Sequence, residues 1–296
     1  MTSLAKAEMT DEEKEENDKE YKALLALFIA MLKNLKDNAT VEESLEALAT
    51  LRMQIAMNHA FDGFKIDREK AIQLLKSVGD NNITKLDKEK RDRLVAAMEN
   101  LADFSVAEEY QVFKKAMETY DMYGEDDIDF NDEDMMEEYE EICELYNKRY
   151  AFIENKDIEY SMGVALWWVL QEENVYLTYM TQNDDRVRPW HFVLQGFTAR
   201  KRDFPEWMIP PIEWGCRCFL ESSDGGIYAH DSRLKYVNAE IKPPKKPEEL
   251  DDVFSESVAK CGKIFGKSHP YFDVDKKDVA MLKRIAKNIK SIYYGK

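Results

Sequence analysis

The sequence predicts an α+β fold: a mainly helical first half, a small α+β domain, and a basic helix at the carboxyl end. Three observations support this. Apolar residues recur at three- and four-residue steps over 24–35 and 45–59, the pattern of amphipathic helices. Residues 174–181 are rich in Val, Tyr and Thr and alternate loosely, which indicates a strand. Apolar residues over 279–292 return to helical spacing, between basic residues.

The first half is expected to hold three to five helices. An acidic, flexible segment (1–20) precedes a helical region (21–157), whose acidic part covers 121–160. Asn38 or Thr40 can cap the second helix, and Gly79 suits the end of a third. The expected helices cover residues 24–35, 45–59, 71–78, 94–101 and 106–117.

The small α+β domain is expected over residues 158–242. A buried helix (162–170) leads into the strand over 174–181, and Pro189 suits the first turn of a short helix that Gly196 can end. Residues 215–220 are expected to form a second strand. The stretch before it contains Pro205, Pro210 and Pro211 and is expected to be irregular. A stiff Pro-rich linker and the basic helix, from about residue 276, occupy 243–296.

Charge is distributed unevenly along the chain. The net charge is −17, with 16 acidic and 3 basic residues over 121–160 but 10 basic and 3 acidic residues over 260–296. The overall field repels nucleic acid, which disfavours a generic DNA coat but leaves the basic last helix as a local contact. The longest apolar run has ten residues, so we expect no membrane span and no secretory signal. Four cysteines favour a reducing compartment over a disulfide scaffold.

The acidic segment has two interpretations. The plainer one is a solvated loop or helix. A calcium site is the alternative, because calcium prefers several oxygen ligands, but the glycine of the usual calcium loop is missing. The carboxylates considered are Asp126, Asp127, Asp129, Asp132 and Asp134.

Cys216, Cys218 and His191 are candidate zinc ligands. In a strand, Cys216 and Cys218 share one face and Arg217 takes the other. With His191 they give the sulfur and nitrogen set that zinc prefers. Asp184, Asp185 or His230 are the candidates for the fourth ligand. The plainer interpretation is two buried thiols and a hydrogen-bonded histidine.

Other chemistry is disfavoured. A cysteine nucleophile needs an open cleft and an orienting acid, which a packed C-R-C segment does not suit. Residues 262–268 resemble a phosphate-binding loop but have one residue too few between the glycines. Arg186 and Arg188 can each clamp a carboxylate or phosphate, or tie a turn to its own domain.

Several of these residues form a spaced motif over 176–220. It resembles the C-terminal domain of the phage Mu F-like head morphogenesis proteins, also called minor head proteins. Trp190 and the basic patch at 200–202 depart from the family pattern. The motif residues, for which the resemblance implies a structural role, are Asp184, Asp185, Arg186, Arg188, His191, Gly196, Pro210, Pro211, Gly215 and Arg217.

The resemblance implies a virion component with no catalytic residues and no cofactor apart from the candidate zinc. Its partners would be the portal and other virion proteins. It would lie in the capsid interior or at the portal vertex, and in the host cytoplasm during assembly. The acidic segment is expected to meet a basic protein surface, and the last helix to meet packaged DNA. The alternative is an ejected effector enzyme, acting on host nucleotides or proteins through His191, Arg186, Arg188 and Glu213.

Overall fold

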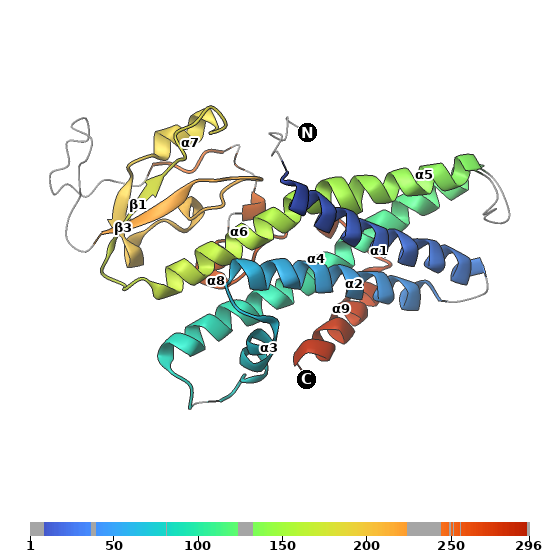
Figure 1. Ribbon diagram of the computed structural model, residues 1–296, viewed down its shortest axis with the longest axis horizontal. Helices are drawn as coiled ribbons and strands as arrows, with labels where there is room; N and C mark the ends of the chain where they lie inside the picture. The colour runs from blue at the N-terminus through green and yellow to red at the C-terminus, as the bar shows by residue number, and fades with distance from the viewer. Residues whose placement is uncertain are drawn as a thin grey trace.

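The fold is α+β, as the sequence predicts. A computed structural model describes residues 9–36, 40–80, 82–123, 133–223, 244–248, 250, 252–254 and 256–294. Long helices form an elongated body, and a small antiparallel sheet lies at one end of it (Figure 1). No helix within these ranges has both the length and the apolar content to span a membrane.

The first helix begins earlier than expected. Helix α1 covers Asp11–Lys36, so the segment expected to be flexible through residue 20 is helical from residue 11. The cause is a capping box. The Glu13 N–H donates to Thr10 Oγ1 at 3.2 Å, and the Thr10 N–H donates to Glu13 Oε2 at 2.8 Å. Asn17 is then buried, and its amide donates to the Lys148 carbonyl at 3.3 Å.

The next three helices form the centre of the body. They are α2 (Val41–Gly63), α3 (Arg68–Lys76) and α4 (Lys85–Tyr123). Thr40 caps α2 as predicted, by accepting the Glu43 N–H, whereas Asn38 lies outside the described residues. The two helices expected over 94–101 and 106–117 are one continuous helix. The residues between them include Phe104 and Ser105, which are fully buried, and no proline or glycine interrupts them.

The acidic segment contributes a helix with one buried face. Helix α5 (Glu133–Glu144) continues through a π-helical turn (Leu145–Tyr150) into α6 (Ala151–Leu170). Met135, Tyr139 and Cys143 are buried in a cluster that also contains residues of α1 and α4. The acidic segment, which was expected to be fully solvated, therefore packs one face of its helix against the body. Of the calcium candidates, only Asp134 is described, and it is exposed.

Helices α2 and α6 cross at very short distance. A Cβ atom added at Gly63 would lie 2.0 Å from the Glu159 carbonyl oxygen, a separation that real side chains do not adopt. Gly163, on the other helix, has more room, because its Cβ would lie 3.4 Å from the Gly63 carbonyl oxygen. Gly63 is therefore required for the close packing of the body.

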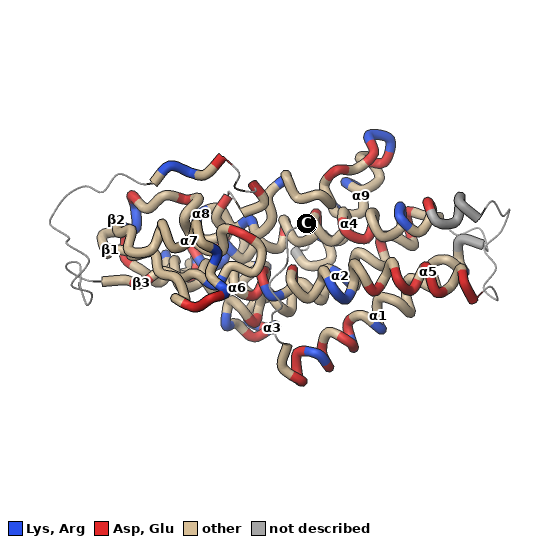
Figure 2. The backbone as a smooth tube through the Cα atoms, turned by 90° about the horizontal axis from the view of Figure 1, so that it is seen from above, with Lys and Arg blue, Asp and Glu red and all other residues tan. Residues whose placement is uncertain are grey.

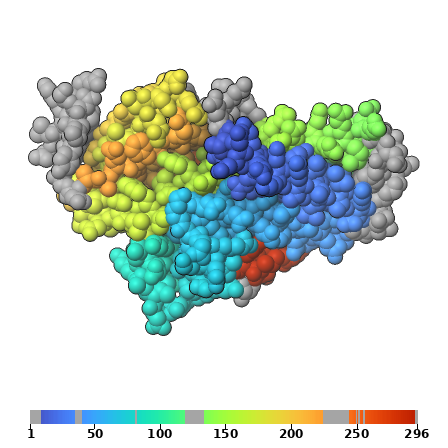
Figure 3. Space-filling model, in the orientation of Figure 1, coloured from blue at the N-terminus to red at the C-terminus, as the bar shows by residue number. Residues whose placement is uncertain are grey.

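The carboxyl end of the chain is part of the main core. The Asn100 side chain, on α4, accepts the N–H groups of Ile264 and Phe265 at 2.8 and 2.9 Å. Phe265 stacks on Phe104 with ring centroids 4.3 Å apart. Helix α9 (Val279–Tyr294) buries its apolar face against α2 and α4, and Figure 3 shows it pressed against that side of the body. The last helix is thus an integral part of the body.

The small sheet has the strand order β2–β1–β3, with both pairs antiparallel. Strand β1 (Tyr176–Met180) confirms the first predicted strand, and β2 (Thr198–Arg200) pairs with it. The second predicted strand is wrong over 215–218. Gly215 is in the left-handed region (φ 63°) and the Cys216 N–H closes a turn onto the Glu213 carbonyl, so β3 (Phe219–Ser223) begins only after the turn.

The short helices complete the described structure. Helix α7 (Pro189–Leu194) matches the predicted short helix, with Pro189 in its first turn and Gly196 at φ 83° after its end. The remaining helical elements are the 3₁₀ turns Lys201–Asp203, Glu206–Met208, Asp252–Phe254 and Pro270–Phe272, and helix α8 (Val258–Cys261).

Candidate functional site

His191, Cys216 and Cys218 come together in the small domain. They are 2%, 3% and 2% exposed, respectively. The His191 Nδ1 atom lies 3.2 Å from Cys218 Sγ and 3.8 Å from Cys216 Sγ. Within the described part of the chain, this is the one group of His, Cys, Asp or Glu residues whose ligand atoms, all within 4.8 Å of one another, could hold a metal ion.

Local backbone geometry brings these side chains together. His191 lies in α7, which begins at Pro189. The turn closed at Gly215 then sends Cys216 and Cys218 to the same side, facing the imidazole. Although this segment is not a strand, the two cysteines face the same side as expected. The Arg217 side chain binds Asp184 instead.

A carboxylate holds the other side of the His191 ring. Glu213 Oε2 lies 3.2 Å from His191 Nε2 and 3.0 Å from Arg188 Nε. Burial raises the pKa of Glu213, but the hydrogen bond to His191 and the Arg188 charge outweigh it, so this pKa lies below its ordinary value. Arg188 also donates to the Trp214 carbonyl at 2.6 Å. Arg188 therefore ties the turn to its own domain.

The two thiols differ in their surroundings. Burial raises the pKa of the Cys216 thiol well above its ordinary value. A hydrogen bond from the Cys216 thiol lowers the pKa of Cys218, which makes Cys218 the better thiolate of the pair. Burial lowers the pKa of His191, but its hydrogen bonds to Cys216 and Glu213 outweigh that effect and raise it overall. The pKa of Cys218 therefore lies below its ordinary value, and that of Cys216 above it.

Arg217 and Asp184 form the outer part of the motif. Arg217 Nη2 lies 2.8 Å from each carboxylate oxygen of Asp184, and the Arg186 N–H donates to Asp184 Oδ1 at 3.1 Å. The side chains of Asp185 and Arg186 are exposed. Neither Asp184 nor Asp185 belongs to the His191 group, and His230 lies outside the described residues.

The remaining motif residues shape the chain path. The Gly196 N–H donates to the Tyr179 carbonyl at 2.8 Å, which attaches the end of α7 to β1. Pro210 and Pro211 are buried and joined by a cis peptide bond. These residues therefore shape the path of the backbone.

Two residues of α6 support the cluster and were not predicted. Both Asp157 carboxylate oxygens accept the Gly215 N–H, at 3.1 and 3.0 Å. The Tyr160 hydroxyl donates to the Cys218 carbonyl. Their three-residue spacing on one helix face was the available signal. It was missed because the expected helix began only at Met162.

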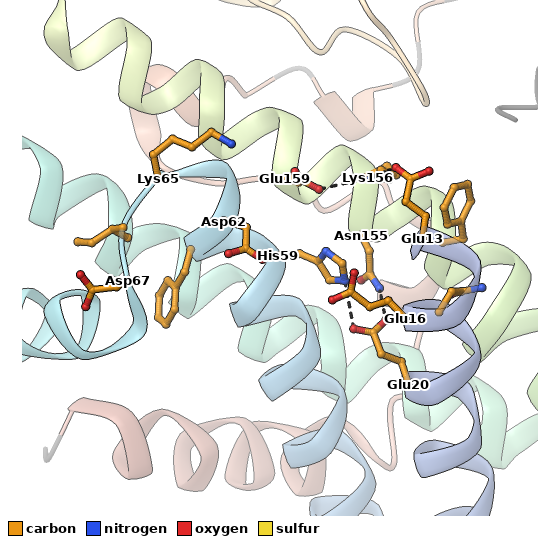
Figure 4. Close-up of a pocket in the computed structure, with 14 residues that line it drawn as sticks. Glu13, Glu16, Glu20, His59, Asp62, Lys65, Asp67, Asn155, Lys156 and Glu159 are labelled. Carbon is orange, nitrogen blue, oxygen red and sulfur yellow. Dashed lines mark hydrogen bonds and ion pairs between the residues drawn. The ribbon is translucent and has the colours of Figure 1, made fainter. Parts of the chain in front are cut away.

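A separate cavity of about 550 Å³ lies between α1, α2 and α6. Glu20, His59 and Asn155 converge in it (Figure 4). His59 Nε2 lies 3.2 Å from Glu20 Oε1, and the Asn155 amide donates to Glu20 Oε2 at 3.2 Å. Lys156 pairs with Glu13 at 2.5 Å across its rim. These pairs join the three helices, so the cavity is best explained as packing between them.

Comparison with known proteins gives one informative match. The chain is 43% identical over 90 residues to the Mu-like prophage FluMu F protein of Haemophilus influenzae. The match covers 29% of this chain and 22% of the relative, so the chain spans about a fifth of the length of the protein that it matches. No protein-family model and no solved structure matches. Part of the chain is therefore similar to a phage-derived F protein.

Proposed function

We propose that this chain is a phage minor head protein that associates with the portal vertex during head morphogenesis. The observation that carries the proposal is the 43% identity over 90 residues to a Mu-like prophage F protein. The motif residues over 184–217 support membership of the same family. The whole chain would then act in the virion, and in the host cytoplasm while the head is assembled.

The bonding of the motif residues supports a structural module. Arg217 is bound to Asp184, and Glu213 links Arg188 to His191. Each of these charged groups is thereby held by another group of the domain. His191 is 2% exposed, so a substrate would reach its imidazole only after a rearrangement of the domain. A non-enzymatic role in assembly therefore needs fewer changes.

An acidic surface supports a basic protein partner. Helix α5 contacts α1, and acidic residues gather along α5 (Figure 2). We propose that this surface meets a basic face of the portal or of another virion protein, because complementary charge speeds and orients association. Its exposed members lie on α5 and are Glu133, Asp134, Glu137, Glu140 and Glu141. On α1 the exposed acidic residues alternate with exposed lysines, and Lys14 and Lys19 pair with Asp11 and Glu15.

Fewer basic residues of the last helix are available to contact packaged DNA than its sequence indicates, because some of them pair with acidic residues of the body. Arg284 pairs with Glu42 at 2.8 Å, and Lys290 pairs with Asp103 at 2.6 Å. Lys283 and Lys287 are exposed on α9, and the described residues place no ion pair on either. These two lysines would supply the DNA contact.

Gene deletion and complementation test the proposed function. Without this chain, we expect a large loss of infectious particles and heads that fail to mature, with wild-type numbers restored when the chain is supplied in trans. Charge reversal of Glu137, Glu140 and Glu141 on the acidic surface should reduce incorporation into heads. Charge reversal of Glu69, Glu99 and Glu221, which are exposed on α3, α4 and β3, is the matched control. Normal heads and normal titre without the chain would contradict the proposal.

A further inference from the structure

We propose that the small domain binds a zinc ion through His191 Nδ1, Cys216 Sγ and Cys218 Sγ. This inference concerns the stability of the domain and goes beyond the proposed role in the head. It rests on the geometry of three buried side chains that come from two separate segments of the chain.

The spacing of the three ligand atoms suits tetrahedral zinc. Zinc bonds of about 2.3 Å to sulfur and about 2.0 Å to nitrogen place neighbouring ligand atoms roughly 3.5–3.8 Å apart. The two distances from His191 Nδ1 to the sulfurs of Cys218 and Cys216 are 3.2 and 3.8 Å. All three atoms lie within 4.8 Å of one another. Small side-chain adjustments would therefore bring them to zinc-binding positions.

Hydrogen bonds can hold His191, Cys216 and Cys218 together without a metal, but the same three atoms are also placed to bind one. One imidazole nitrogen faces two sulfur atoms, and Nδ1 carries either one proton or one lone pair. A metal ion would satisfy Nδ1 and both sulfurs at once. Two thiolates would also neutralise the charge of Zn²⁺, which matters because Cys216 and Cys218 are almost fully buried. A disulfide between cysteines only two residues apart would instead be strained.

Glu213 orients the histidine as a metal ligand. It lies 3.2 Å from His191 Nε2, so an Nε2–H donating to it leaves the Nδ1 lone pair directed at the sulfurs. A carboxylate that holds the second nitrogen of a zinc-binding histidine is a recurring feature of zinc sites. Arg188, 3.0 Å from the same Glu213 oxygen, fixes the carboxylate in turn. The site thus has supporting partners as well as ligands.

A zinc ion here would close a loop within the domain. It would join α7 to the segment before β3, with 24 residues between His191 and Cys216. The domain has a sheet of three short strands, so we infer that the metal contributes to its stability. The described residues supply three ligands, and a water molecule would take the fourth tetrahedral position. Its removal should therefore lower the melting temperature of the domain.

Metal analysis and cobalt substitution of the full chain test the proposal. Protein purified without chelators should contain about one zinc ion per chain. Co²⁺ should give a thiolate-to-cobalt charge-transfer band and intense visible bands of tetrahedral cobalt. Cys216→Ser, Cys218→Ser and His191→Ala should lose at least about tenfold in zinc affinity. The matched controls Cys143→Ser and Cys261→Ser, which alter thiols outside the site, should keep the metal.

If a variant fails to fold, the cobalt spectrum and the zinc content of the wild-type chain still test the proposal. Chelation should lower the melting temperature of the wild-type chain, and added zinc should restore it. Wild-type protein that holds no zinc after incubation with it, or that gives no charge-transfer band with cobalt, would overturn the proposal. Zinc retained by folded Cys216→Ser and Cys218→Ser chains would overturn it equally. None of these outcomes depends on whether the chain enters a virion.

Discussion

Asp157, on helix α6, accepts the Gly215 N–H with both carboxylate oxygens, at 3.1 and 3.0 Å. This contact attaches the helical body to the segment that carries Cys216 and Cys218. Asp157 is 2% exposed, and Gly215 has a positive φ of 63°. The position of the cluster therefore depends on a residue of the helical half of the chain.

Replacing Asp157 with alanine should destabilise the chain by about 0.5–1.5 kcal/mol, because the Gly215 N–H would lose its hydrogen bond to the α6 side chain. Urea unfolding monitored by tryptophan fluorescence measures the change. Asp157→Asn retains a carbonyl oxygen for Gly215 and is the matched control. Because burial raises the pKa of Asp157 from 3.8 to about 8, removal of this ionisable group should make Asp157→Asn at least as stable as wild type above pH 8. Equal losses in the two variants would show that the acceptor is not the cause.

Gly63→Ala should destabilise the body by about 1–3 kcal/mol, because the new methyl group would overlap the Glu159 carbonyl of the crossing helix. Gly163→Ala is the control. Its methyl group has room at 3.4 Å, and alanine favours the helix by up to about 1 kcal/mol over glycine. Thermal unfolding of both variants makes the comparison. A Gly63→Ala chain as stable as wild type would contradict the close crossing of α2 and α6.

The buried carboxylates of the body predict a loss of stability at alkaline pH. Burial, and then the neighbouring Glu108, raise the pKa of Glu109 from 4.5 to about 8. Because the folded-state pKa is the higher one, the stabilisation from protonated Glu109 is complete below about pH 4.5 and is lost as the pH rises through 8. Arg52, whose Nε lies 2.5 Å from Glu108, compensates only part of the buried negative charge.

Glu109→Gln should therefore be more stable than wild type at pH 8, by about 1 kcal/mol or more, and the difference should shrink towards pH 5. Urea midpoints measured between these pH values test it. Glu99→Gln, at an exposed position of the same helix, should show no such trend. A constant difference between Glu109→Gln and wild type across the pH range would refute the assignment.

Glu213→Gln should weaken zinc binding by about 10–100-fold while leaving the three ligands in place. Amide nitrogen or neutral oxygen holds the His191 ring less firmly than a carboxylate does. Competition with a chromophoric chelator gives the affinity. Glu221→Gln, exposed on β3, is the control. Unchanged affinity would show that Glu213 does not orient the histidine.

Much of the fold could be predicted from the sequence because the residues that start and end its elements act locally. Thr40, Pro189 and Gly196 each act within a few residues, and their roles are confirmed by the structure. The start of β3 was placed too early because the left-handed Gly215 ends any extended run at that point. Local patterns also divided α4, whose middle is held helical by packing around Phe104.

The candidate site could be predicted only in part, because some of its contacts join distant segments of the chain. His191, Cys216 and Cys218 were recognisable by residue type, and the structure brings them together. Asp157 and Tyr160 each bond to a residue 58 positions away in the sequence. The contact between Asn100 and Ile264 spans a still longer stretch of the chain. Such long-range pairs depend on how α6 and the body pack, which no pattern within one segment specifies.

Quantitative proteomics of gradient-purified phage particles, before and after triggered DNA release, tests the central claim most directly. The particles must come from the genome that encodes this chain. The proposal predicts a few copies of the chain per particle, at the stoichiometry of a portal-associated protein. Copies retained after release would identify a structural vertex component, and copies lost with the DNA would identify ejected cargo of the same head. Absence of the chain from purified, infectious particles would contradict the account.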